Sequence, residues 1–150
     1  MKYITEGQYN AAILADELIT AFGTAYGLST AGQELTLYDV PDESDVVVVI
    51  EGHVARAPAR ELKRIEDSLT KALEDFYDLK AKERRYDSRY TCSLRAGYVG
   101  PFQAEGIAFA TWMDSCNAYA YQVMSDVLAG DRDVPSAEEL IAALPTLAWS

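Results

Sequence analysis

The chain has 150 residues, 49% hydrophobic and 11% aromatic, so it can bury a core and is not a disordered acidic tail. Its 24 acidic and 13 basic side chains give a formal charge of −11, which argues against general binding to nucleic acid or anionic lipid. Because the sequence shows neither an apolar run of about 18 residues nor an export signal, we expect a cytoplasmic protein.

The charge is unevenly distributed. Residues 1–55 contain nine acids and one basic residue, residues 56–95 eleven basic residues and eight acids, and residues 96–150 seven acids and one basic residue. Such asymmetry is expected where segments pair internally or where a partner recognises one of them. We expect an N-terminal α/β lobe at 1–55 and a helical domain at 56–150, together forming one compact unit.

The first third is predicted to be a helix followed by a hairpin. The helix is indicated by apolar residues at every fourth position: Leu14, Leu18, Phe22 and Tyr26. Residues 35–40 are predicted as a strand, 41–44 as a turn and 46–50 as a second strand, β-branched and apolar on both faces. Two strands alone are marginally stable, so a helix or a third strand, for which residues 2–4 are the candidate, must cover them.

A long helix is predicted to begin near Pro58. Its apolar residues alternate three and four apart: Leu62, Ile65, Leu69, Ala72, Phe76 and Leu79. This spacing fits a coiled-coil seam for self-association, but an amphipathic helix lying on a single-chain core is the favoured interpretation. We expect the helix to continue to Arg89, where basic residues alternate with tyrosines. That pattern can bind nucleic acid, but the acidic flanks favour a solvated, partly self-paired helix end.

A second long helix is predicted from Gln103 to Ala129, with Gly130 as its C-terminal glycine. Residues 135–139 predict a short third helix that opens with a capping box. The expected fold class is therefore helix-rich α+β: an N-terminal helix and small β-hairpin or sheet, then two long antiparallel helices and a short C-terminal helix.

Catalytic constellations are not recognisable in the sequence. His53 has no nucleophile in a familiar setting and is interpreted as a plain loop or strand-end residue. Cys92 and Cys116 lack metal-ligand spacing and are interpreted as buried thiols. We therefore expect no enzyme activity, no cofactor and no metal.

The last two thirds of the chain contain an ordered series of short motifs. These are Tyr86-Asp87-Ser88, Gly97-Tyr98, Pro101-Phe102-Gln103-Ala104-Glu105-Gly106, Trp112-Met113-Asp114, and Gly130 with Pro135-Ser136-Ala137-Glu138-Glu139-Leu140-Ile141 and Leu144-Pro145. From Lys80 to Pro145 the chain resembles a C-terminal module of small tailed-bacteriophage proteins described as tail-fibre assembly or tail accessory proteins. The resemblance implies a non-enzymatic chaperone or accessory factor that contacts a phage tail or tail-fibre protein in the host cytoplasm, or within the virion.

Candidate partner-binding residues follow from this setting. Five aromatic residues lie at or near the predicted bends: Tyr86, Tyr90, Tyr98, Phe102 and Trp112. They could anchor a partner or pack the hinges between the helices. Val47 and Val49 of the predicted strand are a second candidate contact, through strand addition or an oligomer interface. The Leu62–Leu79 helix is the candidate for a homo-oligomer.

Two other functions stay open. One is a virion structural subunit of the tail or baseplate. The other is an acidic inhibitor of host defence that mimics DNA, although eleven basic residues within 56–95 argue against a mimic.

Overall fold

The computed structural model describes residues 2–4, 11–22, 28–31, 34–37 and 43–149, with side chains at 13–21 and 45–149. The chain divides into two compact units, Met1–Arg64 and Ile65–Ser150. This boundary falls within one long helix, α3 (Ala57–Lys82), whereas the sequence placed the domain boundary at residue 55.

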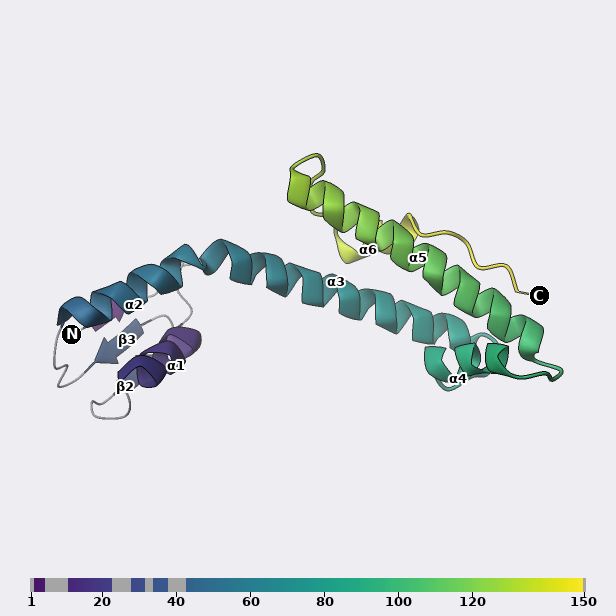
Figure 1. Cartoon of the computed structure of the whole chain (residues 1–150), viewed down its shortest axis with the longest axis horizontal. Coiled ribbons are helices and arrows are strands. Elements are labelled where there is room, and N and C mark those ends of the chain that lie inside the picture. The colour runs from purple at the N-terminus through teal and green to yellow at the C-terminus, as the bar shows by residue number, and fades with distance from the viewer. Residues whose placement is uncertain (1, 5–10, 23–27, 32–33, 38–42, 150) are drawn as a thin grey trace. The chain divides into compact units, whose positions relative to one another are not determined.

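The first unit contains a short three-stranded antiparallel sheet and two helices (Figure 1). The strands are β1 (Lys2–Ile4), β2 (Leu28–Ala31) and β3 (Glu34–Leu37), in the order β1-β3-β2. Lys2 is opposite Thr36 in one pair, and Leu28 is opposite Leu37 in the other. The helices are α1 (Ala11–Phe22) and α2 (Glu43–Ala55).

The predicted α+β fold is wrong in its β part, because residues 46–50 are helical. Val46, Ile50 and His53 in α2 are 1%, 6% and 0% exposed, and their spacing of four and three places them on one helical face. Each β-branched residue lowers helix stability only by a fraction of a kcal/mol, so burial of this face outweighs the strand preference. The predicted turn at 41–44 lies partly outside the described residues.

The core of the first unit is formed where α1 lies beside α2. Leu14 and Leu18 of α1 are fully buried, as their four-residue spacing predicted, and α2 contributes Val46 and Ile50. The predicted stripe continued to Tyr26, which lies outside the described residues; α1 spans Ala11–Phe22, and residues 28–31 form β2.

The second unit is helical. After α3 come α4 (Arg89–Leu94), the 3-10 turn η1 (Arg95–Gly97), α5 (Gln103–Ala129) and α6 (Ala137–Ala142). The long helix was expected to continue to Arg89 but ends at Lys82. Beyond it, Arg85 takes the left-handed conformation with φ 65°, and Ser88 caps the N-terminus of the separate helix α4.

Within this unit the end of α3 runs antiparallel to α5 (Figure 1). Arg84, just after α3, pairs with Glu105 near the start of α5, whereas Tyr77 donates a hydrogen bond of 2.9 Å to Asn117 farther along α5. The bounds predicted for α5 are confirmed. Gly130 ends the helix at φ 80°, and its N–H donates to the carbonyls of the preceding turn.

Trp112 lies at the centre of the core of the second unit. Its ring contacts Phe76, Tyr77 and Phe109 at centroid distances of 5.9, 5.4 and 5.5 Å, and its indole N–H donates to the Pro145 carbonyl at 2.7 Å. The capping box predicted for α6 is present, with Ser136 and Glu139 each accepting a backbone hydrogen bond of the other. The segment after α5 is thereby held against the helix pair.

Candidate partner-binding surface

Four apolar side chains are exposed where the chain bends from α4 into α5. Leu94 is 68% exposed, Tyr98 47%, Val99 92% and Phe102 53%. We call these four residues the bend surface. Their exposure is notable because the same unit buries Phe109 and Trp112 almost completely a few residues later.

Close backbone packing holds the bend in place. A Cβ at Gly106 would lie 2.4 Å from the backbone nitrogen of Ala96 and 2.7 Å from the carbonyl carbon of Arg95. Only glycine lets η1 approach the first turns of α5 so closely. The Gln103 side chain also donates to the Ala96 carbonyl at 3.3 Å. The bend surface therefore rests on a rigid crossing.

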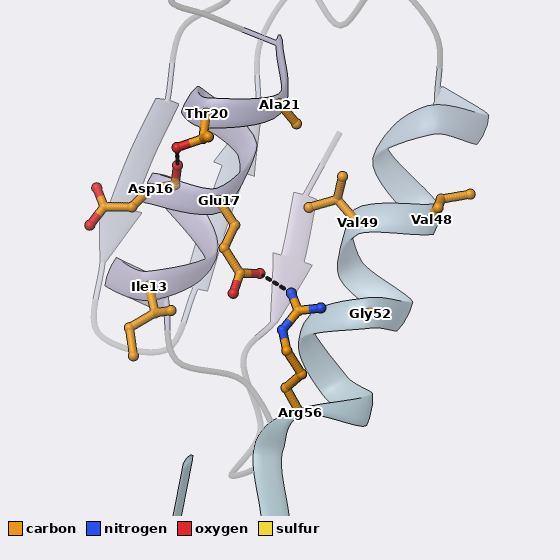
Figure 2. Close-up of a pocket in the computed structure, with 9 residues that line it drawn as sticks. All are labelled: Ile13, Asp16, Glu17, Thr20, Ala21, Val48, Val49, Gly52 and Arg56. Atoms are coloured by element: carbon orange, nitrogen blue, oxygen red, sulfur yellow. Dashed lines mark hydrogen bonds and ion pairs between the residues drawn. The ribbon is translucent and has the colours of Figure 1, made fainter. Parts of the chain in front are cut away.

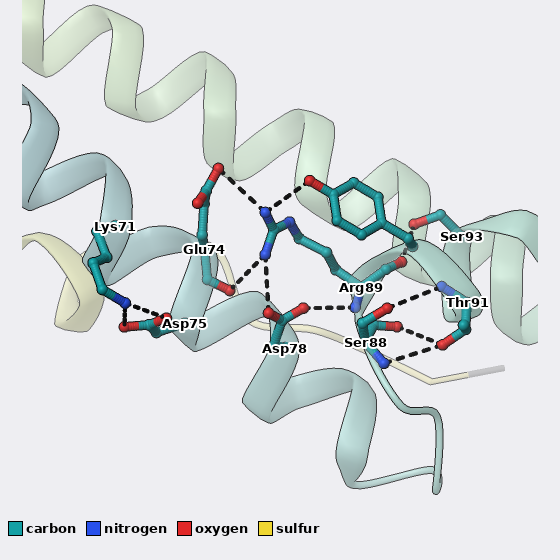
Figure 3. A network of polar contacts seen from close by, with 9 residues as sticks. Lys71, Glu74, Asp75, Asp78, Ser88, Arg89, Thr91 and Ser93 are labelled. Carbon is teal, nitrogen blue, oxygen red and sulfur yellow. Dashed lines mark hydrogen bonds and ion pairs between the residues drawn. The ribbon is translucent and has the colours of Figure 1, made fainter.

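Arg89 attaches α4 to α3 (Figure 3). Its backbone N–H and its guanidinium donate to the two carboxylate oxygens of Asp78 at 2.8 and 2.9 Å, and its guanidinium lies 3.2 Å from Glu74. The side chain is only 14% exposed, so these charge-assisted bonds are stronger than a surface pair. Ser88 and Thr91 add a reciprocal capping box at the start of α4.

The aromatic candidates at the bends divide into structural and exposed residues. Tyr86 is partly buried and donates to Glu105 at 2.8 Å; burial raises the pKa of its hydroxyl to about 12, and the Glu105 carboxylate adds to this. Trp112 is 6% exposed and belongs to the core. Tyr90 is 69% exposed, with the Arg89 guanidinium 4.5 Å from its ring centroid. Tyr98 and Phe102 are part of the bend surface.

The valine candidates lie in the first unit, on a helix and not on a strand. Val47 is 41% exposed and Val49 partly buried, both on α2. Strand addition through 46–50 is excluded because this backbone is hydrogen-bonded within a helix. In α3, Leu69 and Phe76 pack against the single-chain core, while Leu62 and Leu79 are 42% and 60% exposed. A homo-oligomer through this helix stays a prediction.

The sequence did not predict Leu94 and Val99 as part of the site. The only available signal was an apolar residue, Val99, in a glycine-rich break that would otherwise be expected to be polar. The position of Leu94 depends on the break between α3 and α4, which the periodicity of the sequence did not indicate.

A polar cluster around His53 was also missed. His53 is fully buried; its Nδ1 lies 3.1 Å from Glu17 of α1, and its Nε2 3.0 Å from a guanidinium nitrogen of Arg60. A guanidinium can only donate, so Nε2 accepts and Nδ1 donates to the carboxylate, which defines a neutral imidazole. Burial lowers the pKa of His53, and the hydrogen bond to Glu17 opposes this in part.

Beside this cluster, a shallow open groove of about 440 Å³ lies between α1 and α2 (Figure 2). Ile13, Ala21 and Val49 form part of its apolar wall, and Glu17 accepts a hydrogen bond of 2.9 Å from Arg56 there. Both ring nitrogens of His53 are already hydrogen-bonded, so the imidazole is a structural group and is poorly placed to act as a base for a molecule in the groove.

The two cysteines are free and buried. Burial raises the pKa of each thiol to about 11. Within the described residues, no group of three or more His, Cys, Asp or Glu side chains is placed to hold a metal ion. In the same part of the chain, no helix is both long and apolar enough to cross a membrane.

Comparison of the chain with protein-family models, with curated proteins and with solved structures finds no match.

Proposed function

We propose that the protein is a non-enzymatic factor of a tailed bacteriophage that binds a tail or tail-fibre protein during assembly in the host cytoplasm. The observation that carries this proposal is the bend surface. Large apolar side chains grouped on one exposed bend are typical of protein-binding sites, because a monomer gains nothing from leaving them in water.

The position of the bend surface within the chain supports the phage setting. Leu94, Tyr98, Val99 and Phe102 all lie inside the segment from Lys80 to Pro145 that resembles the tail-fibre assembly and tail accessory proteins. Tyr98 and Phe102 belong to two of the short motifs on which that resemblance rests. The segment that resembles phage tail proteins is therefore also the segment that carries the exposed bend surface.

The rigidity of the bend also supports a binding role. Gly106 and the Arg89 network fix α4, η1 and the start of α5 against α3, so the apolar side chains lose little backbone entropy when a partner binds. A surface held in its bound conformation suits a chaperone that must recognise a folding fibre quickly.

Co-expression tests the proposed function. The tail-fibre protein of the same phage is expressed alone, with the wild-type chain, and with a chain carrying Leu94→Asp and Phe102→Asp. We expect the wild-type chain to raise the soluble yield of fibre protein and to co-purify with it, and the double variant to do neither. Tyr121→Asp is the matched control, because Tyr121 is 68% exposed but lies along α5 away from the bend.

Purified phage particles separate an assembly factor from a virion subunit. An assembly factor is absent from mature particles, whereas a tail or baseplate subunit is present at fixed copy number. A fibre protein whose soluble yield is the same with and without the chain would contradict the proposed function.

A further inference from the structure

Arg95 lies beside two residues of the bend surface. It directly follows Leu94 and begins η1, and its guanidinium carbon lies 5.8 Å from the ring centroid of Tyr98. The guanidinium also donates a hydrogen bond to the Tyr98 hydroxyl. A Cβ at Gly106 would lie 2.8 Å from the Cβ of Arg95, so the packing of η1 on α5 fixes the point from which this side chain extends. The bend surface therefore has one cation at a defined position.

No carboxylate of the described residues compensates this cation. Within this part of the chain, no Asp or Glu side chain lies within ion-pair distance of the Arg95 guanidinium, and its Nε is buried without a hydrogen-bond acceptor. Glu105, the acid in the first turn of α5, already accepts hydrogen bonds from Arg84 at 3.3 Å and from Tyr86 at 2.8 Å. Arg95 is thus a partly buried cation without a counter-ion.

The neighbouring Arg89 shows what a structural arginine looks like in this unit. Its guanidinium is paired with Asp78 at 2.9 Å and with Glu74 at 3.2 Å. Acids outnumber basic residues by 24 to 13, so the lack of a partner at Arg95 does not come from a shortage of carboxylates. Because a buried polar group without a partner destabilises the folded chain, folding of this unit alone does not account for an arginine at position 95.

We propose that the partner segment bound by the bend surface is apolar and carries a carboxylate, which pairs with Arg95. The guanidinium fits this role because it presents several N–H donors in one plane, and Tyr98 uses only one of them. Covering Leu94 and Phe102 removes water from the neighbouring ion pair, which strengthens its attraction. The inference rests on the proposed function and adds the chemistry of the tail-protein segment.

Two other occupants of the bend surface fit this charge less well. Nucleic acid binding draws on several phosphate contacts, whereas Arg95 is a single guanidinium in a chain with a charge of −11. In a two-fold dimer that joins one bend surface to another, the two copies of Arg95 would approach each other with like charge. A carboxylate on a different protein meets neither difficulty.

Calorimetric titration of the purified tail-fibre protein with the full chain tests the inference. Arg95→Met keeps an unbranched apolar side chain but removes the charge and the buried Nε. We expect it to weaken binding about tenfold or more, whereas the free energy of unfolding in urea stays equal or rises. Arg132→Met is the matched control, because Arg132 donates to the Tyr119 hydroxyl at 3.5 Å beyond the other end of α5, and we expect no change in affinity.

Salt dependence separates the charge of Arg95 from its packing. Wild-type binding should weaken as the NaCl concentration rises from about 0.05 to about 0.5 M, and Arg95→Met should show a smaller dependence because it lacks the ion pair. Arg95→Lys keeps the charge and should bind more tightly than Arg95→Met. If Arg95→Met does not fold by circular dichroism, Arg95→Gln takes its place.

Equal affinity of the folded Arg95→Met variant and the wild-type chain overturns the inference and leaves the proposed function standing. A loss of affinity with unchanged salt dependence has the same meaning, because Arg95 then acts through packing. A wild-type chain that does not bind the fibre protein contradicts both. Sedimentation equilibrium and titration with a single-stranded oligonucleotide examine the other occupants: self-association or oligonucleotide binding that Arg95→Met abolishes would also overturn the inference.

Discussion

Gly106→Ala is predicted to destabilise the second unit although alanine is the better helix former. Within a helix, alanine is favoured over glycine by about 1 kcal/mol, so without a close neighbour the substitution would stabilise α5. In this structure the new Cβ would lie 2.4, 2.7 and 2.8 Å from atoms of Ala96 and Arg95, two of them backbone atoms. Relief requires η1 to move away from α5, and overpacking of this kind destabilises by about 1–3 kcal/mol, occasionally more.

Because the closest contacts are with backbone atoms, the overpacking cost falls at the upper end, about 3 kcal/mol, and subtracting the gain in helix propensity leaves an expected loss of about 2 kcal/mol in the free energy of unfolding. Urea unfolding followed by circular dichroism measures it. Gly97→Ala is the matched control, because a Cβ at Gly97 meets no atom within 4 Å, and we expect it to change stability little. A Gly106→Ala variant as stable as the wild-type chain, or more stable, would refute the close crossing of η1 and α5.

Three further predictions follow from the buried polar groups and the caps. The chain has one histidine, so an NMR titration of the imidazole reports His53 alone, and we expect a pKa below 6.5. The contribution of the neutral His53 to the free energy of unfolding is then fully present above pH 6.5 and is lost as the pH falls towards the pKa of the folded state. A pKa at or above 6.5 would contradict the buried neutral form. A thiol-specific disulfide reagent at pH 8 should modify Cys92 and Cys116 quickly in urea, whereas in buffer it should modify them only as fast as the chain opens. The reason is that burial raises the pKa of each thiol to about 11, so little reactive thiolate is present in the folded chain. Rapid modification of the folded chain would show that the thiols are accessible. Ser136→Ala removes the cap of α6 and should lower the free energy of unfolding by about 1 kcal/mol in urea titrations, whereas no change would show that the cap does not stabilise the fold.

In the second unit, local sequence signals were sufficient to predict α5 and α6, but not the end of α3 at Lys82 or the separate helix α4. The apolar stripe of α5 and the glycine that ends it are both local signals, and the helix has the predicted bounds from Gln103 to Ala129. The capping box of α6 is also local, since its two partners are three residues apart. Such features are readable because the atoms that form them are close together along the chain.

Residues 46–50 show where local pattern fails. Five consecutive β-branched residues are typical of a strand, yet their contribution depends on what they pack against. Val46 and Ile50 are buried beside α1, and His53 continues the same face to meet Glu17, 36 residues away in sequence. The sequence also contains a helical spacing of four and three residues, from Val46 to Ile50 to His53. Only the contact with α1 decides whether this segment forms a helix or a strand.

The exposure of the candidate partner-binding residues could be predicted only in part. Tyr98 and Phe102 are exposed as a partner contact requires, whereas Tyr86 and Trp112 contribute to the packing between helices. Periodicity alone did not separate these roles, because an aromatic residue near a bend can point either way. Leu94 joined the site only through the unexpected end of α3 at Lys82, which in turn follows from the left-handed Arg85.

Calorimetric titration with the purified tail-fibre protein tests most directly whether the bend surface binds the tail protein. We expect the wild-type chain and the Tyr121→Asp control to bind with similar affinity. Leu94→Asp with Phe102→Asp should weaken binding about a hundredfold or more, as expected when two central apolar contacts are lost. Equal affinity of this folded double variant and the wild-type chain would contradict the claim.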